Sequence, residues 1–259
     1  NLKLFEVYMN ISGNIITLNE EKNIEQCIES LRQVCDEIVV VDSGSSDRTV
    51  EIAKSLGAIV IDQPYLGDGI QKNVALTHVS NDWVLSLDAD ERLTAEMVQA
   101  IKSLDLNNSD IDAYAFRRKN MIGSRWIKYC GWYPDYCIRL YNKNSAKFDN
   151  VKQHARVIAR NVQRLNVDIV HYSFKNVSEL FSKAGRGYPT RSAKIMYLAG
   201  KRTNKWAPFT HGLSAFIKCY FIKKGFLQGV DGFSVALSAS VNSYLKYARL
   251  LEFQNDQKV

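Results

Sequence analysis

Two carboxylates separated by one residue, Asp88 and Asp90, stand at the end of the apolar run 82–88, and Glu91 follows them. Carboxylates at this spacing can share a hard divalent cation, and a diphosphate could complete its coordination sphere. Such a cation neutralises the charge that develops on a phosphate leaving group. An isolated pair of this kind is more often a loop or helix-capping cluster. In this chain, the polar groups that follow the neighbouring predicted strands favour the metal-binding interpretation.

A second polar group occupies residues 42–47, with the sequence D-S-G-S-S-D. Its glycine permits a tight turn, and its later serines and last aspartate can cap the helix that follows. Capping does not account for Asp42, whose carboxylate could accept hydrogen bonds from a nucleotide base or ribose. Lys72, near the start of a further predicted helix, could reach a phosphate or be a solvated surface lysine.

The aromatic-rich loop 123–135 ends in Asp135. A carboxylate that aromatic rings partly desolvate is suited to general-base work, although a turn aspartate after proline is an equally good description. His154 could be a third metal ligand, a donor to phosphate, or a surface histidine. His171 lies on a predicted strand, where a hydrogen-bonded structural role is the expectation.

Alternating strands and helices position these groups in the first part of the chain. The apolar patterns predict strands at 11–17, 37–42, 58–62 and 82–88, and helices at 20–35, 46–56, 69–79 and 94–104. This order predicts right-handed βαβ units and a mainly parallel α/β sheet, whose ligands bind beyond the carboxyl ends of the strands. Thr17, Asn19 and Glu20 follow the first strand, so we expect them to meet Asp42 and Asp88 in one crevice.

The pattern changes beyond residue 110. Strands with irregular connections are predicted at 111–119, 137–142, 156–159 and 168–172, which makes the sheet mixed, and helices follow from residue 177. We therefore predict an α/β domain at 1–174, made of a mainly parallel part at 1–110 and a mixed part at 111–174. A basic helical region would occupy 175–259.

Composition and charge limit the class of protein. The 259 residues are 46% hydrophobic and 24% charged, which is ordinary for a globular chain. Five scattered cysteines without Cys-x-x-Cys spacing argue against a disulfide framework or structural zinc, and they fit a reducing compartment. The first ten residues contain no long apolar run, so we expect no secretory signal and a cytoplasmic location.

The positive charge is concentrated at the end of the chain. Residues 1–174 hold 20 Lys and Arg against 23 Asp and Glu, whereas residues 175–259 hold 14 against 4. Aromatic and aliphatic residues alternate with lysines between 206 and 251, but no run of about 18 uncharged apolar residues could cross a bilayer. We expect peripheral association with a membrane surface through basic amphipathic helices. The alternatives are packing on the catalytic core or on a second subunit, and the oligomeric state stays open.

Four motifs in order then give a resemblance: I-I-T-L-N-E-E at 15–21, V-V-D-S-G-S-S-D-R-T at 40–49, L-S-L-D-A-D-E-R at 85–92 and G-W-Y-P-D-Y at 131–136. The combination resembles family 2 inverting glycosyltransferases. It is most similar to lipopolysaccharide core β-1,4-glucosyltransferases of the WaaE/KdtX/LgtF type, and the similarity extends to G-F-L-Q-G-V-D-G-F at 225–233.

The resemblance implies a GT-A catalytic domain at 1–174, with a nucleotide-sugar-binding half at 1–110 and an acceptor half at 111–174, at the periphery of the inner membrane. It also implies a role for each matching residue. Asp90 would ligate Mg²⁺ or Mn²⁺ on the diphosphate of a UDP-sugar, and Asp135 would deprotonate the acceptor hydroxyl. The residues expected to bind the donor are Thr17, Asn19, Glu20, Asp42, Lys72, Asp88 and His154. The implied reaction moves a hexose, glucose from UDP-glucose, onto the inner-core heptose of a lipid-anchored lipopolysaccharide or lipooligosaccharide core.

The chain departs from this pattern at one position. Related sequences carry His-Glu where His154-Ala155 stands here, which makes the role of His154 less secure than that of Asp90.

Two other functions compete with a transferase. A sugar nucleotidylyltransferase would need a glycine-rich basic loop near residue 15, which is absent from the sequence. A non-catalytic polyanion binder would leave the acidic crevice unexplained, so we expect no nucleic-acid partner. A processive synthase would normally need transmembrane helices.

Overall fold

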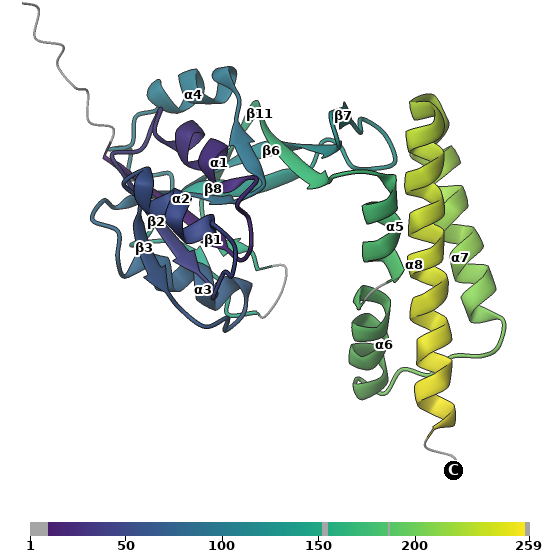
Figure 1. The fold of residues 1–259 in the computed structure, drawn as a ribbon. Coiled ribbons are helices and arrows are strands. Elements are labelled where there is room, and N and C mark those ends of the chain that lie inside the picture. Colours follow the sequence, from purple (N-terminus) through teal and green to yellow (C-terminus); the bar gives the residue numbers. More distant parts are fainter. Residues whose placement is uncertain (1–9, 152–154, 186, 257–259) are drawn as a thin grey trace, which may run out of the picture. The chain divides into compact units, whose positions relative to one another are not determined.

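The computed structural model describes residues 10–151, 155–185 and 187–256. The chain divides into two compact units (Figure 1). Unit 1 consists of Asn1–Arg118 with Asp135–His171, and unit 2 of Lys119–Pro134 with Tyr172–Val259.

A nine-stranded sheet has the order β3-β2-β1-β4-β8-β6-β11-β5, with β7 paired to β6. Most of its residues belong to unit 1, whereas β7 and the last residues of β6 and β11 belong to unit 2. β1, β2, β3 and β4 are parallel, and β8 joins β4 in the antiparallel direction. The mainly parallel and then mixed sheet predicted from the sequence is confirmed. The strands are β1 Ile11–Thr17, β2 Glu37–Asp42, β3 Ile59–Asp62, β4 Trp83–Asp88, β5 Glu91–Leu93, β6 Ala113–Ile122, β7 Arg125–Trp126, β8 Tyr136–Asn142 and β11 Val162–Phe174. A separate pair is formed by β9 Lys147–Phe148 and β10 Val157–Ile158.

Four helices connect the first strands: α1 Ile24–Leu31, α2 Thr49–Ser55, α3 Asp68–Leu76 and α4 Ala95–Lys102. The predicted helix at 20–35 is shorter than expected because Glu20 begins a turn, and its carbonyl accepts hydrogen bonds from the amides of Asn23 and Ile24. The predicted strand that ends at Asp88 is followed, after two residues, by β5, which the apolar pattern did not predict.

Apolar side chains on both faces explain why β2 is a continuous apolar strand. Ile38 and Val40 belong to one buried cluster, which includes side chains of α1 and α4. Val39 and Val41 belong to another, which includes Ala75 of α3. Successive side chains of a strand point to opposite faces, so a strand buried on both sides has no polar alternation.

Strand register aligns the carboxyl ends of the parallel strands. Thr17 is paired with Asp42 between β1 and β2, Ile16 with Asp88 between β1 and β4, and Asp42 with Asp62. Polar residues that are far apart in sequence are therefore at the same level of the sheet, as the βαβ order predicts.

Unit 2 is mainly helical: α5 Val177–Gly185, α6 Tyr188–Leu198, α7 Ala207–Ile217, the π-helix η1 Lys218–Ile222, the 3₁₀ helix η2 Gly225–Gln228 and α8 Gly229–Asn255. The long α8 packs along α6 and α7. The small core of unit 2 includes Ile122, Ile127 and Leu180 together with Val235 of α8. No helix within the described ranges is long and apolar enough to cross a membrane. All five cysteines are free thiols, as expected.

Candidate active site

The loops after β1 and β2 are tied together by Asn19. Its backbone amide donates to Ser45 Oγ at 2.8 Å, and its Oδ1 accepts from the Ser46 amide at 2.9 Å. Asn19 has φ 56°, in the left-handed region that asparagine tolerates better than most residues. Glu20 joins the same assembly because its amide donates to Thr49 Oγ1 at 2.8 Å. These contacts fix the shape of the loop pair at the edge of the sheet.

Asp42 organises the loop that follows it. Its Oδ2 accepts from the amides of Gly44 at 2.9 Å and Ser45 at 2.7 Å, and its Oδ1 accepts from Ser45 Oγ. The side chain is 3% exposed. Thr17, its register partner, is also buried, and its hydroxyl oxygen has no hydrogen-bond partner within the described residues. A buried hydroxyl without a partner is costly, so this position is suited to meeting a ligand atom.

Asp88 is held between two cations. Its Oδ1 is 2.6 Å from Lys72 Nζ, and its Oδ2 is 2.7 Å from Arg139 Nη2. Desolvation alone would raise the pKa of Asp88, but the attraction of Lys72 and Arg139 outweighs it and holds the pKa far below its ordinary value of 3.8. Because both of its oxygens have basic partners, Asp88 is better placed to position Lys72 and Arg139 than to bind a metal ion.

Glu91 provides the second anchor for Arg139. Its side chain is fully buried, its Oε1 is 2.6 Å from Arg139 Nη2, and its Oε2 accepts from the Asp88 amide at 3.1 Å. Arg118 lies 3.8 Å from the same carboxylate. Buried charges need partners of this kind, since an unpaired one would cost several kcal/mol. Glu91 therefore fixes the positions of Arg139 and of the Asp88 backbone.

Asp90 has a different partner. Its Oδ2 is 3.4 Å from His171 Nε2, contributed by β11. Two ligands that are each about 2.1 Å from one ion lie about 3 Å apart when they subtend a right angle, so this oxygen and nitrogen are spaced to share a divalent cation. No group of three or more His, Cys, Asp and Glu that could hold a metal exists within the described part of the chain. Since Mg²⁺ is commonly bound by one or two carboxylates plus substrate phosphates, a two-residue set fits a metal–diphosphate complex.

Asp135 is positioned by Arg118. The guanidinium donates twice to one carboxylate oxygen, Oδ2, from Nε at 2.9 Å and Nη2 at 2.6 Å. The backbone adds a bond from the Arg118 amide to the Asp135 carbonyl at 2.7 Å. About a third of the carboxylate side chain is exposed. A double hydrogen bond of this kind orients a carboxylate while leaving it accessible to an acceptor hydroxyl.

A cavity of about 740 Å³ brings four of the predicted residues together: Lys72, Asp88, Asp90 and Asp135. Arg118, Arg139 and His171 also line it. Among the described residues, the cavity lining does not include Thr17, Asn19, Glu20 or Asp42, which occupy the neighbouring strand end and loops. His154, predicted as a possible ligand, lies outside the described residues.

The sequence reasoning did not predict Arg118, Arg139 or His171 as residues of the functional site. His171 was expected to be structural, but it pairs with Asp90. Arg118 and Arg139 carried no signal of their own, because an arginine on a half-buried strand resembles any surface arginine in sequence. Antiparallel pairing of β6 with β8 brings Arg118 near Asp135, and antiparallel pairing of β8 with β4 brings Arg139 near Asp88.

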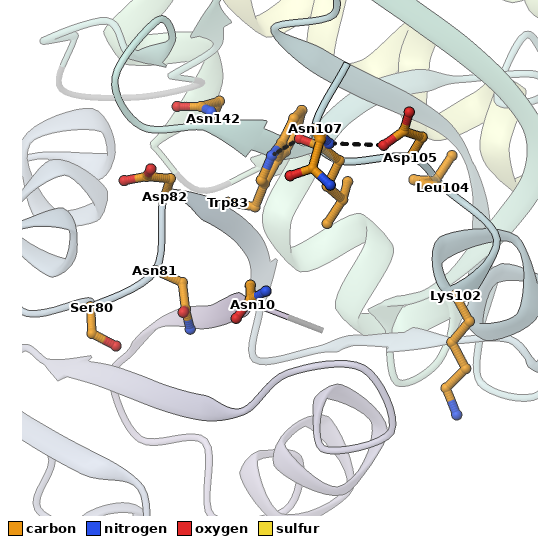
Figure 2. A pocket seen from close by; sticks show the side chains of 11 residues that line it. Asn10, Ser80, Asn81, Asp82, Trp83, Lys102, Leu104, Asp105, Asn107 and Asn142 are labelled. Atoms are coloured by element: carbon orange, nitrogen blue, oxygen red, sulfur yellow. Dashed lines mark hydrogen bonds between the residues drawn. The ribbon is translucent and has the colours of Figure 1, made fainter. Parts of the chain in front are cut away.

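The opposite edge of the parallel sheet contains a second cavity of about 570 Å³ (Figure 2). Asn10, Asp82 and Trp83 line it at the amino ends of β1 and β4. Ligands of open parallel sheets bind at carboxyl ends, so this polar hollow is the weaker candidate site.

Known proteins share this sequence pattern. Residues 14–162 match the family model for Glycosyl transferase family 2. An uncharacterized glycosyltransferase of Rickettsia bellii is 35% identical over 254 residues, which cover 93% of this chain and 86% of that protein. The lipopolysaccharide core biosynthesis glycosyltransferase LpsC of Rhizobium meliloti is 28% identical over 93% of this chain and 92% of its own length. Among solved structures, residues 1–349 of S. aureus TarS in complex with UDP give a TM-score of 0.48 at 16% identity, over 96% and 92% of the two chains.

The mixed sheet with a cavity of acidic and basic side chains at its carboxyl edge, followed by helices, is a GT-A architecture. Together with the family match, it defines the class of protein as a glycosyltransferase. The chain belongs to glycosyltransferase family 2.

Proposed function

We propose that this transferase moves a hexose, glucose from UDP-glucose, with inversion onto a heptose of the inner core of lipopolysaccharide or lipooligosaccharide. The observation that carries the proposal is the meeting of Asp90, His171 and Asp135 in one cavity. These residues supply a place for a metal–diphosphate and a carboxylate for the acceptor in the same space. The similarity to LpsC supports a core oligosaccharide as the acceptor. A lipid-anchored acceptor would place the enzyme at the periphery of the inner membrane.

Each group then has a role in donor binding. Thr17, Asn19, Glu20 and Asp42 form the strand end and loops that would receive the uridine. Lys72, held by Asp88, would lie near the diphosphate. Asp90 and His171 would hold Mg²⁺ or Mn²⁺, which when bound stabilises the charge of the departing UDP. His154, which lies outside the described residues, keeps its predicted role toward the metal or a phosphate.

Asp135 would act on the acceptor. Its carboxylate, oriented by Arg118, accepts the proton of the acceptor hydroxyl while that oxygen bonds to the anomeric carbon and the bond to UDP breaks. The attack comes from the face opposite the leaving group, so a single displacement inverts the anomeric configuration and needs no protein nucleophile.

Donor binding tests the proposal. We expect one of UDP-glucose, UDP-galactose and UDP-N-acetylglucosamine to bind best, and only with Mn²⁺ or Mg²⁺, by isothermal titration calorimetry. Asp90→Asn and His171→Ala should each weaken metal-dependent binding about tenfold or more. Asp82→Asn, which changes an exposed carboxylate at the opposite edge of the sheet, is the matched control and should bind like the wild type. Undiminished binding in both site variants would overturn the metal assignment.

A further inference from the structure

The α7–α8 hairpin of unit 2 leaves large apolar side chains exposed. Trp206, at the N-cap of α7, is 64% exposed, and Phe209 and Leu213 follow it at 59% and 61%. The spacing continues to Ile217, and positions 206, 209, 213 and 217 share one side of a helix. A surface helix normally buries such a stripe, so this one is available to a partner.

Further exposed apolar side chains follow in η1, η2 and α8. Ile222 of η1 is 71% exposed and Val230 of α8 is 81% exposed. Exposed Phe221, Phe226 and Phe233 all contact the ring of Tyr220, with centroids 5.2 to 6.4 Å apart. The exposed apolar side chains between residues 206 and 237, which belong to α7, η1, η2 and the first part of α8, are here named the apolar face.

The part of the sequence that contains most of the apolar face is rich in basic residues and lacks acidic ones. Residues 180–230 contain ten Lys and Arg and no Asp or Glu. In the whole of unit 2, 17 Lys and Arg stand against 4 Asp and Glu, whereas unit 1 has 17 against 23. Lys218, Lys223 and Lys224 lie within or next to η1, amid the exposed aromatic side chains. A partner for this surface must combine apolar groups with negative charge.

We propose that the apolar face docks on an anionic lipid surface, with the α7–α8 hairpin lying in the membrane interface rather than spanning it. Tryptophan and other aromatic rings favour the headgroup region, and lysines can bury their methylene stems while their ammonium groups meet lipid phosphates. No helix of the described residues suits a membrane span.

Charge favours lipid over a second copy of this chain. Two apolar faces brought together would juxtapose two units that each carry a net charge of +13 (17 basic minus 4 acidic residues). A bilayer that contains phosphatidylglycerol offers hydrocarbon and phosphate at the same surface, and each nearby basic residue then contributes to binding.

Vesicle co-sedimentation with the full chain tests the proposal. We expect binding to vesicles of phosphatidylcholine with phosphatidylglycerol, weaker binding to phosphatidylcholine alone, and a decrease as salt screens the charges. Ile222→Gln should weaken partitioning about tenfold, because an apolar side chain that would enter the bilayer is replaced by a polar one. Lys224→Gln should weaken it about fivefold. Ile158→Gln, which changes a 63% exposed isoleucine of unit 1, is the matched control and should bind normally.

Trp206 identifies the face that inserts. Brominated lipids should quench its fluorescence, and the quenching should disappear in Trp206→Phe while vesicle binding is largely kept. Equal binding of Ile222→Gln and wild type, or quenching unchanged in Trp206→Phe, would overturn the proposal. So would a dimer in light scattering that Ile222→Gln converts to a monomer. None of these measurements depends on the sugar donor, so their failure is distinguishable from failure of the proposed transferase reaction.

Discussion

Individual carboxylates of the acidic motif have distinct surroundings. Asp88 is neutralised by Lys72 and Arg139, whereas Asp90 faces His171. In the proposed site, Asp90 is therefore the candidate metal ligand, and Asp88 orders the basic side chains Lys72 and Arg139. The motif alone does not distinguish these roles, because both residues are aspartates beside the same strand.

The role of Asp135 can be separated from donor binding. Asp135→Asn keeps the size of the side chain but removes the base, so kcat for transfer should fall about 10²- to 10⁴-fold while the Kd for the UDP-sugar stays unchanged. Steady-state kinetics with a core-oligosaccharide acceptor, together with calorimetric donor titration, measure both quantities. Asp68→Asn, another carboxylate of the same cavity, is the control and should retain a higher kcat than Asp135→Asn. A loss of donor affinity equal to the loss of kcat would argue that Asp135 binds substrate rather than taking its proton.

At the scale of elements, helix α3 depends on a close backbone approach. A Cβ added to Gly69 would lie 1.8 Å from the carbonyl oxygen of Asp149, and the Gly69 amide donates to the Val151 carbonyl at 3.3 Å. The same helix carries Lys72, which contacts Asp88. The glycine therefore permits the packing that places a cavity lysine.

Gly69→Ala should consequently lower both stability and donor affinity. We expect a loss of about 1–3 kcal/mol in the free energy of unfolding from the forced backbone shift, measured by urea denaturation, and weaker UDP-sugar binding. Gly185→Ala in α5 meets nothing within 4 Å and should be neutral or slightly stabilising, since alanine favours helix. Wild-type stability in Gly69→Ala would show that the loop around Asp149 yields without cost.

The amino ends of the strands are joined by Glu37. Its carboxylate accepts from Ser12 Oγ and from the amide and hydroxyl of Ser80, the latter at 2.7 Å. Desolvation raises the pKa of Glu37, but these hydrogen bonds outweigh it and hold the pKa below its ordinary value of 4.5. A group with a lowered folded pKa stabilises the protein above its unfolded pKa, and this stabilisation is lost as pH falls through the folded value.

Glu37→Gln should therefore flatten the loss of stability below pH 4.5 and lower stability at neutral pH. Urea denaturation at a series of pH values measures the slope of the unfolding free energy. Glu29→Gln, on the exposed side of α1, should keep the wild-type slope. A slope that Glu37→Gln leaves unchanged would mean that the hydrogen bonds do not favour the ionised carboxylate.

At the scale of the whole molecule, the two units differ in charge and chemistry. The acidic unit 1 contains the cavity and the basic unit 2 contains the apolar face. If unit 2 serves to hold the enzyme at a lipid surface, its variants should affect only reactions on membrane-bound acceptors.

Ile222→Gln should hydrolyse the UDP-sugar in solution at the wild-type rate, but it should transfer sugar more slowly to a lipid-anchored acceptor in vesicles. A delipidated acceptor should restore the rate. Asp90→Asn should lose UDP-sugar hydrolysis, transfer to the vesicle-bound acceptor and transfer to the delipidated acceptor. A radiolabelled donor measures all three, as free sugar released or as sugar transferred. Equal losses on soluble and vesicle-bound acceptors would place Ile222 in acceptor binding rather than lipid binding.

Local sequence determined the parallel half of the sheet. The apolar run E-I-V-V-V-D predicted β2 at its observed bounds, and strand and helix alternation predicted that Thr17, Asp42 and Asp88 reach the same edge. Such patterns are readable because side-chain burial repeats with the period of each element. The motifs at 15–21, 40–49, 85–92 and 131–136, taken together, also predicted a family 2 glycosyltransferase, which the family match confirms.

Only the tertiary structure decided which charges meet. Lys72 and Asp88 are 16 residues apart, and Arg139 and Asp88 are 51 apart. The partner of Asp90 depends on the antiparallel pairing of β11 with β5, where His171 is opposite Glu91. A period-two pattern specifies which face a residue occupies but not which strand is its neighbour or in what register. For that reason the sequence alone predicted only an acidic crevice. The fold gave each carboxylate its own partner: Arg139 and Lys72 for Asp88, His171 for the candidate metal ligand Asp90, and Arg118 for the candidate base Asp135.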